Sequence, residues 1–187
     1  EVNVQDMLVG DRNALMVAVR VTGYGTRYNA DVTCPECGAR NSASFSLSDL
    51  EIKRLEINPV EKGQNLFEYT LPITGKKVHF KFLTGKDEEE RSLVAERRKK
   101  MLPDSVIENN VTARLEQVIV SIDGIEDRNK INTFIKNMPA QDSRKLRKYV
   151  LENEPGIDMS SWLKCSSCSQ SSKVPLPMGI NFFWPSE

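Results

Sequence analysis

The sequence predicts an α+β fold, in which a ribbon-like β module built from both chain ends accompanies a β-hairpin and an inserted helical bundle. Two observations predict it. All four cysteines of the 187 residues fall into two C-x-x-C pairs, one near each end, and short strand-like stretches flank both pairs. Between the pairs, the charged segment 87–154 repeats its apolar residues with the period of a helix.

Three segments therefore follow one another along the chain. Residues 1–86 hold an N-terminal helix, the first cysteine pair and the hairpin. Residues 87–154 form the helical insert, and residues 155–187 hold the second cysteine pair and an aromatic tail. The length suits one domain with an insertion, so the first and last segments are expected to form one compact body.

The first segment is expected to begin with a helix that Asp11 caps and that ends before Gly23. Its inward face is expected to consist of four apolar residues, namely Ala14, Leu15, Ala18 and Val19. A strand is the alternative, since the run MVAVRV also alternates. Further along, residues 66–82 alternate on both sides of ITGKK, which predicts a β-hairpin with Gly75 in its turn.

The insert is expected to be helical throughout. Its inward positions recur every three or four residues: Ile107, Val111, Leu115, Val118, Ile119, Ile122, Ile131, Phe134, Ile135 and Met138. The last helix is expected to open with Pro139 and to carry Asp142 in its first turn, while Pro155 and Gly156 end it. Its inward face is expected to hold Leu146, Tyr149 and Val150.

Two C-x-x-C pairs suit one tetrahedral zinc site in a zinc-ribbon-like module, because each turn presents two thiolates and structural zinc takes four ligands. The ligands are then Cys34, Cys37, Cys165 and Cys168, with one structural Zn²⁺ per chain. The second pair begins 128 positions after the first ends, and closing that loop costs roughly 4 kcal/mol beyond a constant. Structural zinc contributes about 10–16 kcal/mol in small peptides, which outweighs the loop.

Three other interpretations of the cysteines stay open. Iron in a four-thiolate, rubredoxin-like site requires the same spacing. A redox dithiol of the thioredoxin kind needs one C-x-x-C at the start of a helix, whereas strand-like residues flank both pairs here. The third interpretation is four unrelated surface cysteines, which rarely fall into two equal spacings by accident.

No catalytic constellation stands out, so we expect neither an enzyme nor a small-molecule substrate. His79, the only histidine, lies in an alternating strand without a nucleophile motif around it. The chain has no G-x-S-x-G, P-loop, H-E-x-x-H or G-x-G-x-x-G sequence. The acidic run Asp87–Glu90 is expected to begin a helix, where carboxylates complement the helix dipole.

Charge and hydropathy bear on the partners. Lys and Arg number 26, as do Asp and Glu, so the net charge of zero does not direct the whole chain to a polyanion. Basic clusters at 97–100 and 144–148 lie among acidic residues without interleaved aromatics. Nucleic acid is therefore the less favoured partner, and a zinc-ribbon regulator that binds nucleic acid is the alternative function. No apolar run approaches the ~20 residues that span a bilayer, which favours a soluble intracellular protein.

Three large aromatic residues lie near the end of the chain: Phe182, Phe183 and Trp184. We expect them to be buried, either against the chain's own ribbon or against another subunit, where aromatic side chains are frequent anchors. In the second case they are the candidate partner-binding residues.

Taken in order, these motifs resemble one family. The stretches LVGDRNALMVAVR, GYGTRY, TCPECG, LPITGKKVHFKFLT, EPGID, CSSC and VPLPMGINFFWP resemble the baseplate hub proteins of T-even-type contractile-tail phages over nearly the whole chain. The resemblance implies a viral protein that builds the baseplate hub, as an assembly chaperone or a structural subunit, without catalysis. It implies other baseplate hub and tail proteins as partners, and the host cytoplasm during tail assembly or the virion tail baseplate as the location.

Within that family the paired C-x-x-C motifs look like metal-binding knuckles, and they match all four cysteines of this chain. One departure concerns the second pair, where Ser169 stands at the position that Gly38 takes after the first pair. Glycine relieves backbone strain at such a position, so the second knuckle is expected to be less regular.

Overall fold

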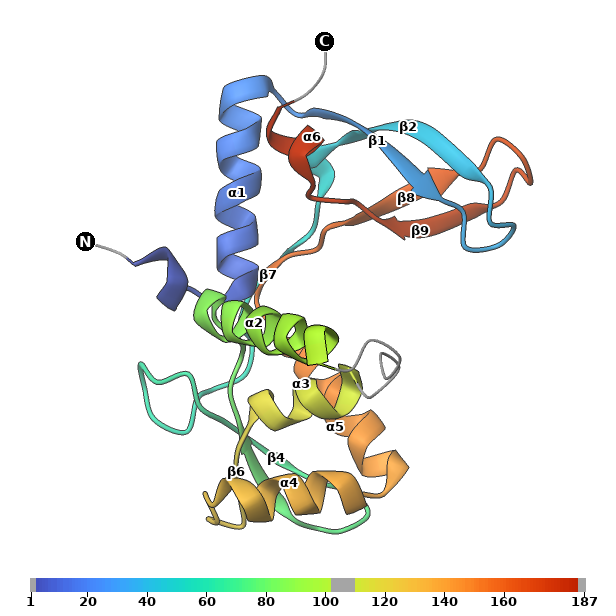
Figure 1. Ribbon diagram of the computed structural model, residues 1–187. Helices are drawn as coiled ribbons and strands as arrows, with labels where there is room; N and C mark the ends of the chain where they lie inside the picture. Colours follow the sequence, from blue (N-terminus) through green and yellow to red (C-terminus); the bar gives the residue numbers. More distant parts are fainter. Residues whose placement is uncertain (1–2, 102–109, 185–187) are drawn as a thin grey trace. The chain divides into compact units, whose positions relative to one another are not determined.

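The structure, a computed structural model, describes residues 3–101 and 110–184 (Figure 1). Helices and several small antiparallel sheets make up these residues, which confirms the predicted α+β class. The side chains of residues 95, 97–101, 110 and 111 lie outside the description.

The chain packs into two compact units, each built from two stretches. The ribbon unit consists of Gly10–Lys53 and Gly156–Glu187, and the helical unit consists of Glu1–Val9 and Arg54–Pro155. The two cysteine pairs therefore meet in one unit, while the predicted hairpin packs with the helices. The three-segment division itself stays a prediction.

Two antiparallel hairpins form most of the ribbon unit. β1 (Arg27–Thr33) pairs with β2 (Arg40–Ser46), and β8 (Ser160–Lys164) pairs with β9 (Ser171–Pro175). Because successive side chains of a strand point to opposite faces, one face of each hairpin turns to the core. The buried core residues are Val17, Tyr28, Ala30, Val32, Cys34, Phe45, Leu47, Leu50, Leu163, Cys165, Val174, Leu176 and Phe182. Four short elements complete the unit: η2 (Leu47–Asp49), β3 (Ile52–Lys53), its antiparallel partner β7 (Gly156–Ile157), and α6 (Ile180–Phe183).

Helix α1 (Val9–Tyr24) confirms the predicted N-terminal helix, and the strand alternative is wrong. Both predicted ends are wrong, because the helix begins at Val9, with Asp11 inside its first turn rather than at the cap, and continues through Gly23 to Tyr24. The predicted inward face is also wrong, because Leu15 and Val19 are 45% and 58% exposed. The helix is apolar on both sides, so spacing alone does not say which side is buried.

The side chain of Arg20 identifies the buried side of α1. Arg20 is only 3% exposed, and its guanidinium donates to the carbonyls of Gly25 at 3.0 Å and Arg27 at 3.1 Å. It also lies over the ring of Tyr24, 5.1 Å from the centroid. The guanidinium therefore holds the segment that leads from α1 into β1 against the helix.

The sheet of the helical unit has the strand order β4-β5-β6. β4 (Phe67–Thr70) and β5 (Lys77–Phe80) form the predicted hairpin. Gly75 takes a φ of +67° in its turn, a conformation that favours glycine. β6 (Ile119–Ile122) pairs antiparallel with β5.

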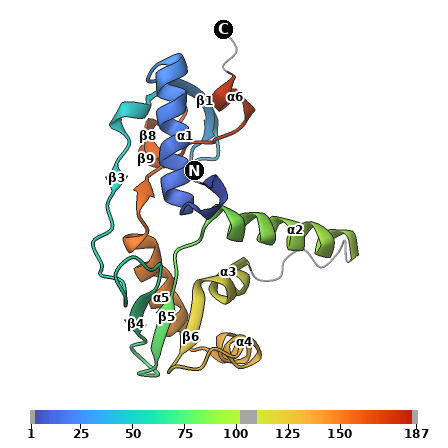
Figure 2. The same ribbon diagram turned by 90° about the vertical axis from the view of Figure 1, so that its left-hand side faces the viewer.

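The helical elements of this unit are η1 (Val4–Asp6), α2 (Gly85–Met101), α3 (Asn110–Val118), α4 (Arg128–Asn137) and α5 (Ala140–Asn153). Figure 2 shows α4 beside β6. The buried core residues are Phe67, Leu71, Val78, Phe80, Phe82, Leu83, Leu115, Val118, Ile119, Ile122, Ile131, Ile135, Leu146 and Val150. Two predicted inward positions, Ile107 and the side chain of Val111, lie outside the described residues.

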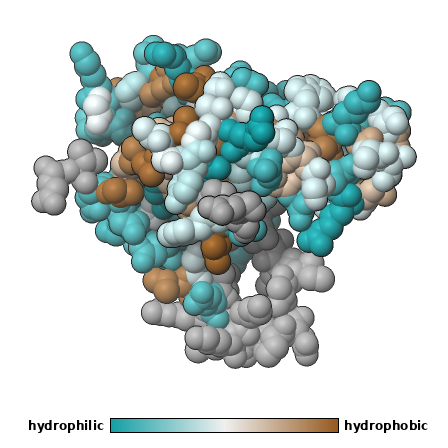
Figure 3. All heavy atoms as spheres, turned by 90° about the horizontal axis from the view of Figure 1, so that it is seen from above, coloured by the Kyte–Doolittle hydropathy of each residue, from teal (hydrophilic) through white to brown (hydrophobic). Residues whose placement is uncertain are grey.

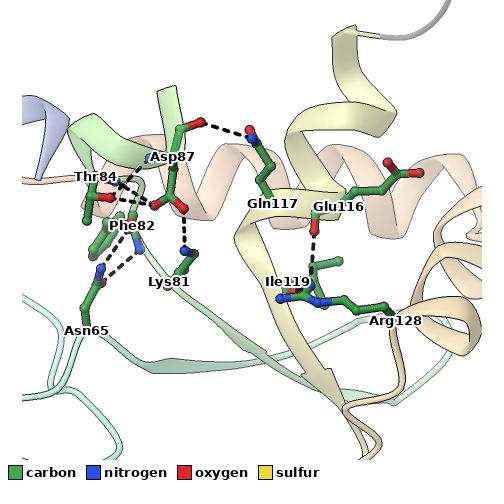
Figure 4. Close-up of polar contacts among 9 residues, drawn as sticks. All are labelled: Asn65, Lys81, Phe82, Thr84, Asp87, Glu116, Gln117, Ile119 and Arg128. Carbon is green, nitrogen blue, oxygen red and sulfur yellow. Dashed lines mark hydrogen bonds and ion pairs between the residues drawn. The ribbon is translucent and has the colours of Figure 1, made fainter. Parts of the chain in front are cut away.

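The prediction of a helix through Ile119 and Ile122 is wrong, because both belong to strand β6. Figure 4 shows how the helix before it ends: the Arg128 guanidinium donates to the carbonyls of Glu116 at 3.2 Å and Ile119 at 2.8 Å. One carbonyl in the last turn of α3 and one at the start of β6 thus share a partner outside both elements. The run Ile-Val-Ser-Ile is rich in β-branched residues, which favour a strand.

Helix α2 begins at the acidic run, as predicted. Asp87 accepts hydrogen bonds from the backbone N–H of Thr84 at 2.9 Å and from Lys81 at 2.7 Å, as Figure 4 shows. Burial alone raises the pKa of this carboxyl, but the hydrogen bonds from Lys81 and Thr84 offset it and hold the pKa below its usual range. Asn65 extends the network, since its amide donates to the carbonyl of Phe82 and accepts from the N–H of the same residue.

Helix α5 follows Pro139, which is its N-cap residue rather than its first helical residue. Asp142 lies in the first turn, as predicted, but it is fully buried. Its carboxylate accepts from the backbone N–H of Ile73 at 2.8 Å and from that of Thr74 at 3.0 Å. The Thr74 hydroxyl donates to it at 2.8 Å. Asp142 therefore fixes the β4–β5 turn to the start of α5.

Candidate metal centre

Each cysteine pair lies in the turn of a hairpin. In the β1–β2 turn, the Cys34 N–H donates to the Ala39 carbonyl and the Gly38 N–H donates to the Cys34 carbonyl, both at 2.9 Å. Residues at the matching positions of the β8–β9 turn form the same two bonds. The Cys165 N–H donates to Gln170 at 2.9 Å, and the Ser169 N–H donates to Cys165 at 3.0 Å.

The position after each pair is left-handed in both turns. Gly38 has a φ of +73° and Ser169 a φ of +60°. The expected irregularity of the second knuckle is therefore absent from its hydrogen bonds. The two turns differ in the residue that adopts this conformation. Serine is strained at positive φ, whereas glycine is not.

The structure brings all four predicted ligands together. Their sulfurs lie within 4.8 Å of one another, with 3.8 Å between Cys34 and Cys168 and 3.7 Å between Cys37 and Cys165. All four thiols are free. A tetrahedron with metal–sulfur distances of about 2.3 Å has sulfurs about 3.8 Å apart. A disulfide requires about 2.05 Å. The sulfur spacing therefore fits a four-thiolate metal site.

Burial is uneven across the cluster. Cys34 and Cys165 are buried, Cys168 is half-buried and Cys37 is exposed. The first cysteine of each turn therefore faces the core of the ribbon unit, and the second faces outward. Both hairpins contribute one buried and one more accessible sulfur.

The surroundings of the sulfurs favour different charge states. The backbone N–H groups of Cys168 and Ser167 point at the Cys165 sulfur and lower the pKa of that thiol to about 6, with a smaller contribution from Asn41. At Cys168 the backbone N–H of Gln170 acts in the same direction, but burial and the neighbouring sulfurs raise the pKa to about 12. Four thiolates at this spacing repel one another, and a divalent cation offsets that repulsion.

Asn41 joins the two turns and has no signal in the sequence. Its Nδ2 donates to the Ala39 carbonyl at 2.9 Å and lies 3.6 Å from the Cys165 sulfur. Its Oδ1 accepts from both the N–H and the hydroxyl of Ser166, each at 2.9 Å. One buried side chain of the first hairpin therefore orients the ligand loop of the second, as residues around metal ligands commonly do.

The aromatic tail divides between core and surface. Phe182 is fully buried, with its ring 5.1 Å from that of Tyr28, so it packs against the chain's own ribbon. The Tyr28 hydroxyl donates to the Pro177 carbonyl at 2.6 Å, which fixes the segment before α6. Phe183 is half-buried, whereas Trp184 is 68% exposed. Of the three candidate partner-binding residues, Trp184 has the most exposed side chain.

His79 lies between Ser121 and Glu68 on three adjacent strands. Its Nδ1 is 2.9 Å from the Ser121 hydroxyl and its Nε2 is 3.4 Å from the Glu68 carboxylate. The order resembles a catalytic triad, but Ser121 is 3% exposed and so is closed to a substrate. The arrangement ties the three strands together.

The two basic clusters lie on helices. The side chains at 97–100 in α2 lie outside the described residues. In α5, Arg147 donates to the carbonyl of Ser143 and Lys148 pairs with Glu152, so two of its four basic residues bind within their own helix. Among the helices of the described residues, none has the length and apolar character that a membrane span needs.

A protein family matches the chain over all the described residues, including the four cysteines. The sequence model of the family described as T4 bacteriophage base plate protein matches residues 1–184. Comparison with curated proteins and with solved structures gave no match.

Proposed function

Since the chain belongs to the family of T4 bacteriophage base plate proteins, we propose that it acts in building the baseplate hub through contacts with other phage proteins. It does so as an assembly chaperone or as a structural subunit of the hub, without catalysis. It works in the host cytoplasm during tail assembly or in the tail baseplate of the virion.

The proposal includes one structural zinc ion held by Cys34, Cys37, Cys165 and Cys168. The sulfur spacing carries it, because separations of 3.7 and 3.8 Å suit a tetrahedral ion. All four ligands come from the protein, which is typical of a structural site. Iron fits the same four thiolates, and the metal analysis below separates the two.

Zinc at this site links two hairpins that are far apart in the sequence. The chain leaves the ribbon unit at Lys53 and returns at Gly156, so the larger stretch of the helical unit, Arg54–Pro155, is an insertion between the two cysteine pairs. Bound metal thus holds together the two stretches that make the ribbon, and it presents the exposed surface of that unit in a fixed form to partners.

Elemental mass spectrometry on protein purified without added metal tests the metal site. We expect about one zinc per chain, and its loss in the Cys165→Ser, Cys168→Ser double variant. Thermal unfolding of that variant is expected at lower temperature, since structural zinc contributes several kcal/mol to folding. Ser167→Ala, an exposed side chain of the same turn, is the matched control and keeps the metal. Wild-type protein without metal would overturn the zinc site and reopen the redox interpretation.

Pull-down of the purified protein against individual baseplate hub and tail proteins tests the partner role. We expect at least one to be retained, and Trp184→Ala to weaken that retention because an exposed tryptophan is a frequent anchor. Trp162→Ala is the matched control, since Trp162 is equally exposed, at 70%, on β8. Failure to retain any hub or tail protein would overturn the proposed function.

A further inference from the structure

An open groove of about 780 Å³ lies on the ribbon unit between the β1–β2 hairpin and the segment before α6. Its hairpin side carries small side chains, among them the cross-strand pairs Ala30/Ala43 and Asp31/Ser42. Its other side is the stretch 177–181, which the Tyr28 hydroxyl holds in place through the Pro177 carbonyl. The groove is therefore bounded by parts of the ribbon that have fixed contacts.

Backbone groups of β1 are available at this groove. In an antiparallel pair, every second residue of a strand bonds to the partner strand. The N–H of Leu47 donates to Thr26 and that of Cys34 to Ala39, so the even-numbered residues of β1 are the ones that bond to β2. The backbone N–H and C=O groups of the odd-numbered residues Asn29 and Asp31 therefore point away from β2. Within the described part of the chain, neither residue forms a backbone hydrogen bond with another element. An extended segment can add to such an edge by main-chain hydrogen bonds.

The negative charge in the groove favours a basic side chain on the segment that binds there. Asp31 is the one charged residue of its lining, and in the described part of the chain its carboxylate accepts from Ser42 but forms no ion pair. Arg27 and Arg40 lie on the same hairpin but do not line the groove. An uncompensated carboxylate beside neutral polar groups is the complement of a lysine or arginine side chain.

Two exposed apolar residues bound α6, and one of them lines the groove. Ile180, the first residue of α6, is 78% exposed and lines the groove. Trp184, which directly follows α6, is 68% exposed, and its backbone N–H donates to the Ile180 carbonyl at 3.0 Å. On the face that Figure 3 shows, hydrophobic residues lie in separate small groups among hydrophilic ones. In the lining of the groove, Ile180 is the exposed large apolar residue among polar and small ones, so a few anchors with polar contacts between them suit this groove better than one broad apolar patch.

We propose that this groove binds an extended segment of a partner protein, which pairs with the β1 edge and places a basic side chain at Asp31 and an apolar one at Ile180. The inference rests on the proposed function, because it names the kind of chain that the ribbon unit takes from a baseplate partner. The occupant is a protein segment, since main-chain pairing and an acidic side chain do not suit the phosphates of nucleic acid.

Amide NMR on the ¹⁵N-labelled, metal-containing protein tests the groove with two short peptides, acetyl-SVRVS-amide and acetyl-SVEVS-amide. The arginine peptide is expected to shift the amides of Asn29, Asp31 and Ile180 saturably, and the glutamate peptide is not. Asp31→Asn is expected to weaken binding of the arginine peptide about five-fold, the size of an exposed charge pair. Asp49→Asn, which removes an exposed carboxylate of the same unit outside the groove, is expected to bind like the wild type.

Four results would overturn the inference: no saturable shift, equal binding of both peptides, unchanged binding in Asp31→Asn, or shifts that map elsewhere. The metal content of Asp31→Asn shows whether that variant keeps its fold. Ser42→Ala is a second variant, which removes the hydroxyl that donates to the Asp31 carboxylate. If the protein retains a baseplate partner in the pull-down but fails the peptide test, this inference falls and the proposed function stands. If no partner is retained, the proposed function falls, whatever the peptides do.

Discussion

The hairpin β1–β2 and the hairpin β8–β9 turn through their cysteines with the same hydrogen bonds, although between Cys34–Asn41 and Cys165–Ser172 only the cysteines match. The comparison separates what a metal-binding turn needs from what varies around it. Two backbone hydrogen bonds and one left-handed residue suffice to present two thiolates. The identity of the other residues changes the energy of the turn and not its path.

The two hairpins differ in the side-chain contacts that run from one to the other. Asn41 of the first hairpin binds the Ser166 backbone and approaches the Cys165 sulfur. At the matching position of the second hairpin stands Ser172, whose side chain is too short to reach across in the same way. The first hairpin therefore supports the ligand turn of the second through a side chain, whereas the second contributes chiefly its sulfurs.

Asn41→Ala removes these contacts, and we expect it to lower stability more than any other substitution outside the four cysteines. It removes a buried side chain that makes four polar contacts and leaves Ser166 without its acceptor. We expect a loss of about 2 kcal/mol in the free energy of unfolding and faster metal transfer to a chelator. Urea unfolding and the rate of metal release measure the two effects.

Ser172→Ala is the matched control for Asn41→Ala, at the same position of the other hairpin. It is expected to cost less than about 1 kcal/mol. Asn41→Ser, which places the residue of the second hairpin in the first, should lie close to Asn41→Ala because serine does not span the gap. Equal losses in Asn41→Ala and Ser172→Ala would contradict the asymmetry and make the hairpins equivalent.

The sequence is sufficient to predict that the four cysteines converge and insufficient to predict the contacts of Asn41, because the two predictions depend on contacts of different range. A C-x-x-C turn is a local structure, so its spacing alone shows which four sulfurs can converge. Asn41 acts on a residue 124 positions away, and nothing near it in the sequence marks that contact. Residues that support a site across the fold become visible only when the fold brings them together.

The same distinction applies to the fold. Strand alternation predicts the hairpins, because a two-residue period and a glycine turn are local signals. The buried face of α1 is not predictable from spacing, because both sides of that helix are apolar and the contacts of Arg20 decide between them. Strand β6 spans only four residues, which is too short a run for a helical and a strand period to be told apart.

The smallest expected change in stability comes from exchanging the two residues with left-handed backbone, Gly38 and Ser169. Ser169→Gly is expected to stabilise the protein by about 0.5 kcal/mol, because it removes roughly 1 kcal/mol of strain at positive φ while the unfolded chain gains freedom. Gly38→Ser is expected to destabilise it by a similar amount. A Cβ at Gly38 meets no atom within 4 Å, so backbone conformation alone accounts for the change. Urea unfolding of both variants with metal bound measures the two values.

The double variant Gly38→Ser, Ser169→Gly places each residue in the other hairpin and so tests whether the two turns are energetically equivalent. If they are, and if the two changes add, they cancel and the stability of the double variant equals that of the wild type. A net loss would mean that the first turn needs its glycine more than the second does. That outcome is consistent with a first hairpin that also holds Asn41 in place, because strain at Gly38 would then pass to Ala39, whose carbonyl accepts from the Asn41 amide. Repeating the exchange in the Asn41→Ala background separates the two cases, because the net loss disappears there only if Asn41 transmits the strain.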